Sequence, residues 1–205
     1  MRAVAVMLAL LILTGCRSGP PTRFYALDAV SAPQRALTSL GAPLKVDAVH
    51  IPPTLDREEV VRGESHNELR ISALDRWAGD FGEMARRVLT QDLQSRLPAG
   101  AVIAPDLPAP ADARGLIVDL LTFEPQSSGE VVLTADWSLM QGSPATPVLQ
   151  RSVRLAAPAG ESAGAQAASM SELLGKLADD IITEIASNAR IGAARAAGGN
   201  ESSLR

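Results

Sequence analysis

The segment 116–155 restricts the fold of this 205-residue chain more than any other, because it contains three strand patterns in succession. Apolar residues alternate with polar ones over 131–139, which is typical of a strand with one face in the core. We therefore expect Trp137 to be buried. The preceding pattern, 116–123, is apolar on both faces and is predicted to be central in a sheet. A weaker alternation over 148–155 completes an antiparallel meander, with short Pro-, Gly- and Ser-containing connections.

Two other segments have helical periodicity. Over 75–97, large apolar residues recur at intervals of three and four, and either Ser72 or Asp75 is placed to cap the start. A second amphipathic helix is predicted from about 169 to 189. The Ala- and Gly-rich segment 191–205 is expected to be a disordered tail.

Shorter strand patterns precede the first helix, at 23–27, 44–51, 58–62 and 67–71. The second of these is apolar on both alternating faces, which suggests cover on both sides. Together the strands and helices predict an α+β fold. We expect a single domain over residues 23–190, in which an antiparallel-rich sheet packs with two long amphipathic helices.

The N-terminal segment has the layout of an exported protein. A positively charged start precedes an apolar run over 3–13, which is shorter than the ~20 residues that cross a bilayer. The run ends in Leu-Thr-Gly-Cys, which contains the only cysteine, Cys16, and resembles the lipobox of bacterial lipoproteins. That resemblance implies a signal peptide over 1–15, lipidation of Cys16 by fatty acids such as palmitate, and a lipidated tether over 16–22. The alternative is an ordinary cleaved signal followed by an incidental thiol.

Composition and motifs argue against several functional classes. The formal net charge of −4 disfavours nucleic acid as a partner. Gly160–Gly164 matches the G-x-S-x-G elbow of hydrolases, but His50 and His66 both precede its serine, whereas the elbow requires a later histidine. The adjacent Asp179 and Asp180 point about 100° apart on a helix and are expected to be solvated. We predict a non-catalytic protein with no cofactor and no metal.

One segment is more specific than its composition. Residues 49–62, taken with Arg76-Trp77-Ala78, resemble the ABC-type transport auxiliary lipoproteins, the PqiC/YmbA-like family. The resemblance extends to the early strand at 24–27, to the glycine-led strand 129–137 that ends in tryptophan, and to the lipobox. The chain departs from the family at 79–81, where it has Gly-Asp-Phe instead of an acidic-Pro-Leu run.

The resemblance implies an outer-membrane lipoprotein that faces the periplasm. Its implied partners are an MCE-domain protein and the inner-membrane permease of the same system, which moves phospholipid or other hydrophobic molecules across the periplasm. Arg17 fits this location, because in the family's sorting rule an Asp after the lipidated cysteine retains the protein in the inner membrane. The expected role is a docking or terminal element. A periplasmic lipid-binding carrier and an envelope-assembly lipoprotein without a transport role remain alternatives, and formation of a homo-oligomer is left open.

The candidate partner-binding residues are Leu55, Asp56, Arg57 and Arg62. They belong to a charged connection that follows two consecutive prolines, where a rigid entry would present both signs of charge to a partner. The alternative is that Asp56 and Arg57 brace the turn, and that Trp77 is a core anchor rather than a contact.

Overall fold

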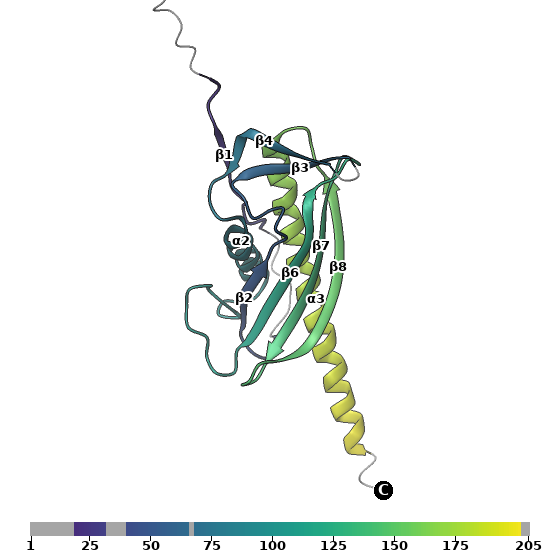
Figure 1. Cartoon of the computed structure of the whole chain (residues 1–205). Helices are drawn as coiled ribbons and strands as arrows, with labels where there is room; N and C mark the ends of the chain where they lie inside the picture. The colour runs from purple at the N-terminus through teal and green to yellow at the C-terminus, as the bar shows by residue number, and fades with distance from the viewer. Residues whose placement is uncertain (1–18, 32–39, 66–67, 202–205) are drawn as a thin grey trace, which may run out of the picture.

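The computed structural model describes residues 19–31, 40–65 and 68–201, with the backbone alone at 65 and 193–201. The predicted signal peptide, Cys16 and His66 therefore lie outside the described residues. Within these ranges the chain forms one five-stranded sheet, one three-stranded sheet and two helices (Figure 1). In chain order the elements are β1 (Arg23–Tyr25), β2 (Leu44–His50), β3 (Glu59–Ser65), β4 (Glu68–Trp77), α2 (Phe81–Arg96), β5 (Val102–Ile103), β6 (Arg114–Pro125), β7 (Glu130–Gln141), β8 (Thr146–Pro158) and α3 (Ala163–Glu201).

The larger sheet has five strands in the order β5-β2-β6-β7-β8. The meander β6-β7-β8 is antiparallel, as predicted, and β6 is central, whereas β2 pairs with β6 and β5 in parallel. Trp137 on β7 is only 1% exposed, which confirms its predicted burial. The smaller sheet has the order β1-β4-β3, with β1 parallel and β3 antiparallel to β4. The α+β class is confirmed, with both sheets mixed.

The apolar pattern of β2 has a cause other than the predicted cover on both sides. The register with β6 shifts between Val46 and Ala48, which marks a β-bulge. An extra residue in one strand exchanges the faces of all residues beyond it. Leu44 and Val46 are therefore buried before the bulge, and Val49 and Ile51 pack against the same core after it.

The first helix begins later than the predicted Asp75. Asp75 and Trp77 instead extend β4, where they pair with Arg23 and Tyr25 of β1. The N-cap is Asp80, whose Oδ1 accepts a hydrogen bond of 2.7 Å from the backbone N–H of Glu83. The 16 residues of α2 give a length of roughly 24 Å, at 1.5 Å per residue.

The second helix is longer than predicted at both ends. Ser162 caps its start by accepting from the backbone N–H of Ala165 at 3.1 Å. The helix continues to Glu201 and so includes most of the segment for which we expected disorder. The many alanines there favour a helix. Its C-terminal part projects beyond the sheet, at the end opposite to β1 (Figure 1). No helix within the described ranges is long and apolar enough to cross a membrane.

The segment that follows β1 is hydrogen-bonded to both α2 and α3. The backbone N–H of Val30 donates to Asp92 Oδ1 at 2.7 Å, and Arg96 Nη1 donates to the Val30 carbonyl at 3.0 Å. Asp28 donates its backbone N–H to Ser171 Oγ at 3.1 Å. Asp92 and Arg96 form a buried ion pair at 3.2 Å, so two charged groups lie within a largely apolar core.

Candidate partner-binding surface

The connection between β2 and β3 forms a tight, exposed turn after the two prolines. The backbone N–H of Leu55 donates to Pro52 O, and that of Arg57 donates to Leu55 O, each at 2.9 Å. Leu55 is 2% exposed and fixes the turn to the core from inside. Asp56 and Arg57 are exposed. Of these candidate residues, Leu55 supports the turn, while Asp56 and Arg57 reach solvent.

Asp56 and Arg57 line a depression of about 440 Å³ that lies between the turn and the start of α2. Its other lining residues come from β1, the residue before β3, the end of β4 and the start of α2: Phe24, Glu58, Trp77, Ala78, Gly79, Asp80 and Phe81. Trp77 is almost wholly buried, which agrees with its role as a core anchor, and its ring centroid lies 4.8 Å from that of Phe81. Phe24 is 65% exposed.

Two lining residues of this first depression form ion pairs with neighbouring side chains. Arg76 Nη1 lies 2.8 Å from Glu58 Oε2, and Arg57 Nε lies 3.6 Å from Glu59 Oε2. Exposed pairs of this kind contribute little to stability, typically about 0–1 kcal/mol. The exposed ring of Phe24 and the side chain of Arg57 are of the residue types that are enriched at protein-binding surfaces.

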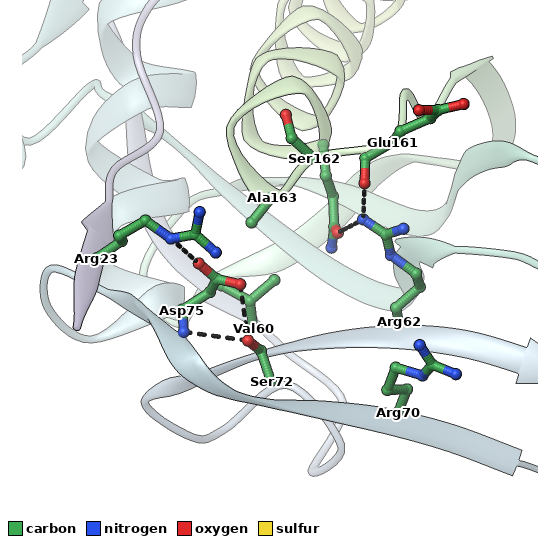
Figure 2. Close-up of a pocket in the computed structure, with 10 residues that line it drawn as sticks. Arg23, Val60, Arg62, Arg70, Ser72, Asp75, Glu161, Ser162 and Ala163 are labelled. Carbon is green, nitrogen blue, oxygen red and sulfur yellow. Dashed lines mark hydrogen bonds and ion pairs between the residues drawn. The ribbon is translucent and has the colours of Figure 1, made fainter. Parts of the chain in front are cut away.

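Arg62 does not join Asp56 and Arg57. It lines a second depression, of about 370 Å³, which also includes Arg23, Arg70 and Asp75 (Figure 2). Arg62 Nη2 donates to the backbone oxygen of Glu161 at 3.2 Å and to Gln166 Oε1 at 3.4 Å. The four candidate residues are thus divided between a buried support and two separate depressions.

Asp75 organises one side of the second depression. It accepts from Arg23 Nε at 2.8 Å, from Ser72 Oγ at 2.7 Å and from the Tyr25 hydroxyl at 3.1 Å. Burial alone would raise the pKa of Asp75, but these hydrogen bonds outweigh burial and lower the pKa. The carboxylate is therefore ionised at neutral pH and holds Arg23 in place.

The sequence patterns did not identify Arg23, Asp75 or Phe24 as surface residues of interest. Their proximity depends on the parallel pairing of β1 with β4, which joins residues 52 positions apart. No local periodicity carries that information. The only available signal was the resemblance, which covered the strand at 24–27 and Arg76-Trp77-Ala78.

The residues that were considered for catalysis cap a helix, lie on the surface or pair with neighbouring side chains. Ser162 of the G-x-S-x-G match is the N-cap of α3. His50 is exposed, with Nδ1 at 2.6 Å from Asp119 Oδ1. Asp179 and Asp180 are half-buried, so they are only partly solvated as expected: Asp179 lies 3.2 Å from Arg96 Nε, and Asp180 accepts from the indole of Trp137. Within the described ranges, no three His, Cys, Asp or Glu side chains are grouped so that they could hold a metal ion.

Comparison with known proteins gives one family and a shared fold. The model of a family described as "ABC-type transport auxiliary lipoprotein component" matches residues 25–182. A crystal structure of an uncharacterized protein superposes with a TM-score of 0.68 at 20% identity, covering 81% of this chain and 99% of that chain. Protein XCC0632 from Xanthomonas campestris superposes with a TM-score of 0.67 at 17% identity, covering 83% and 99%. Identities this low establish the fold alone. No curated protein matches the chain by sequence.

Proposed function

Because the chain belongs to the family of ABC-type transport auxiliary lipoprotein components, we propose that it is a non-catalytic docking or terminal element of an MCE/ABC-type transport system. In this proposal Cys16 carries the lipid, and the protein is anchored in the outer membrane facing the periplasm. The system would move phospholipid or other hydrophobic molecules. The observation that carries the proposal is the family match over most of the chain, together with the lipobox-like end of the N-terminal apolar run.

The exposed turn supports a docking role more than a carrier role. Asp56 and Arg57 reach solvent from a turn that is fixed by the buried Leu55, so the contact surface is ordered before a partner arrives. Preorganised surfaces bind more tightly because less conformational entropy is lost on binding. We therefore propose Asp56 and Arg57, with Phe24 beside them, as the contact with the MCE-domain partner.

The anchor is tested by replacing Cys16 with serine. A serine cannot form the thioether, so we expect Cys16→Ser to give an uncleaved or soluble periplasmic protein. The measurement is immunodetection in separated inner-membrane, outer-membrane and periplasmic fractions. Arg17→Asp is the matched control, because it keeps the lipid but should retain the protein in the inner membrane. Recovery of Cys16→Ser in the outer membrane at wild-type levels would overturn the anchor.

The dock is tested by reversing the charge of Arg57. Reversal of a desolvated interface charge typically costs about 2–5 kcal/mol of binding free energy, so Arg57→Glu should bind the MCE-domain partner roughly 30-fold more weakly or worse. The melting temperature should change little, because the Arg57–Glu59 pair is exposed. Pull-down and thermal unfolding are measured on the same preparation.

Arg154→Glu, on the exposed β8 strand, is the control for a charge reversal elsewhere on the surface. A lowered melting temperature with unchanged affinity would assign Arg57 to bracing the turn. No change in either quantity would place the working surface elsewhere on the domain.

A further inference from the structure

Arg62 is held at the rim of the second depression without a carboxylate partner among the described residues. Both of its hydrogen-bond acceptors are neutral, namely the backbone oxygen of Glu161 and the side-chain oxygen of Gln166. Figure 2 shows the backbone oxygen of Glu161 directed at Arg62, while its carboxylate points away. No described carboxylate is therefore paired with the guanidinium, and it has N–H donors beyond those used in these bonds.

The buried side chain of Gln166 holds Arg62 in position. Gln166 is only 1% exposed, and its Nε2 donates to the Val61 carbonyl at 2.9 Å. That bond determines which way the amide faces, so Oε1 is presented to Arg62. A cation that is oriented in advance binds an anion with a smaller entropic cost.

Two further arginines and a helix N-terminus lie beside Arg62, together with the carboxylates of Asp75 and Glu161. Arg23 of β1 and Arg70 of β4 line the same depression. Each has its own carboxylate, since Arg23 pairs with Asp75 and Arg70 donates to both oxygens of Glu64, but a guanidinium carries five N–H donors and these contacts leave some unused. The start of α3 closes the site, and its first turn contains no acidic residue. A helix N-terminus favours negative charge.

We propose that this depression binds a phosphate group, with Arg62 as the main ligand and Arg70 and the start of α3 beside it. Guanidinium groups bind phosphate oxygens in pairs, and a tetrahedral anion suits donors that approach from different elements. The depression, of about 370 Å³, is large enough to hold a substituted phosphate. Two sources share this chemistry: free inorganic phosphate and the phosphodiester of a phospholipid headgroup.

The location of the site favours the headgroup as the source, because the lipid proposed at Cys16 would hold this end of the molecule near a membrane. Arg23 is the first residue of β1, and residues 19–22 lead away from the body at this same end of the molecule (Figure 1). The inference does not require the docking role proposed above. A protein that binds no transport partner could still bind phosphate here, so the two proposals succeed or fail separately.

The test uses the full chain, purified in a non-ionic detergent that contains no phosphate, at low ionic strength. Inorganic phosphate and dihexanoyl phosphatidylglycerol, kept below its micellar concentration, are titrated separately by calorimetry. The variant is Arg62→Gln, and the matched control is Arg154→Gln, because Arg154 is an exposed arginine on β8 that donates to the neutral Thr134 hydroxyl. Losing a charge-assisted ligand should weaken binding roughly tenfold or more, with the control unchanged.

The two titrations distinguish the sources. Tighter binding of phosphatidylglycerol than of inorganic phosphate supports the headgroup, and binding of inorganic phosphate alone supports the free anion. If Arg62→Gln does not fold, Arg70→Gln replaces it, because the Arg70 side chain is 67% exposed and can be changed without loss of packing. Absence of binding by both ligands, or binding that the folded variant leaves unaltered, would overturn the proposal.

Discussion

Replacing Trp137 with alanine is expected to lower the free energy of unfolding by about 3–5 kcal/mol, as removal of a buried aromatic side chain does. Trp137 is 1% exposed and lies on β7 between β6 and β8. Its indole N–H also donates to Asp180 Oδ2 at 3.4 Å. The substitution therefore leaves a cavity in the core and removes a donor from a half-buried carboxylate. Urea unfolding followed by circular dichroism measures the change.

Two variants separate the parts of this effect. Trp137→Phe keeps an aromatic ring in the core but removes the N–H donor and part of the indole volume, so its cost should be clearly smaller than that of Trp137→Ala. Leu121→Ala, on the neighbouring β6, is the surface control, because Leu121 is 54% exposed and such changes usually stay within about 0.5 kcal/mol. A loss below about 1 kcal/mol for Trp137→Ala would contradict its place in the core.

Replacing Arg96 with methionine should cost about 3–5 kcal/mol at pH 7, because it leaves a buried charge without its partner. Asp92 is 0% exposed, and Arg96 Nη1 lies 3.2 Å from its Oδ1. The same guanidinium donates to the Val30 carbonyl, so the segment that follows β1 also loses a hydrogen bond. The exposed Arg87 on the same helix pairs with Glu83 at 3.0 Å and is the matched control; Arg87→Met should cost less than about 1 kcal/mol.

The cost of Arg96→Met should depend on pH in a defined direction. Burial raises the pKa of Asp92 from 3.8 to about 6, against the opposing effects of its bond from Val30 and of Arg96, while Asp179 nearby adds to the rise. A raised folded-state pKa means that the folded protein binds the proton more tightly than the unfolded chain. The contribution of Asp92 therefore stabilises the fold at low pH and is lost as the pH rises from about 4 through 6.

Without Arg96 the ionised form of Asp92 becomes still less favourable. The stability difference between wild type and Arg96→Met should thus be largest above pH 7 and should decrease below pH 6, where Asp92 is protonated. Adding Asp92→Asn to Arg96→Met should remove this pH dependence and recover part of the loss. A difference that stays constant from pH 5 to pH 8 would show that Asp92 is not the group responsible; these pH values bracket its pKa of about 6.

Local patterns predicted the larger sheet well, because its meander is built from neighbours in the sequence. The alternation along β7 was enough to bury Trp137 and to place β6 and β8 beside it. The start of α2 was mispredicted for the opposite reason. Trp77 has helical spacing to Phe81, but it belongs to a strand because β1, about 50 positions earlier, pairs with it. Local periodicity cannot distinguish these two uses of the same residue.

The same distinction applies to the candidate surfaces. Asp56 and Arg57 stand on a turn whose bonds are all local, so their exposure followed from the sequence. Arg62 is only five residues further on, yet its neighbour Gln166 is 104 positions away, at a helix start that was predicted six residues too late. The charges in this connection therefore could not be divided between two depressions until the position of α3 was known.

The length of α3 gives the domain two distant poles. The helix begins beside β1, where Gly164 lies next to the Tyr25 ring, and its 39 residues give a contour of roughly 58 Å. Both depressions belong to the pole from which the N-terminal chain leaves, and the far end of α3 belongs to the other (Figure 1). A surface that binds the first pole therefore lies at the opposite end of the molecule from the C-terminal end of α3. The two poles are held apart by the length of α3.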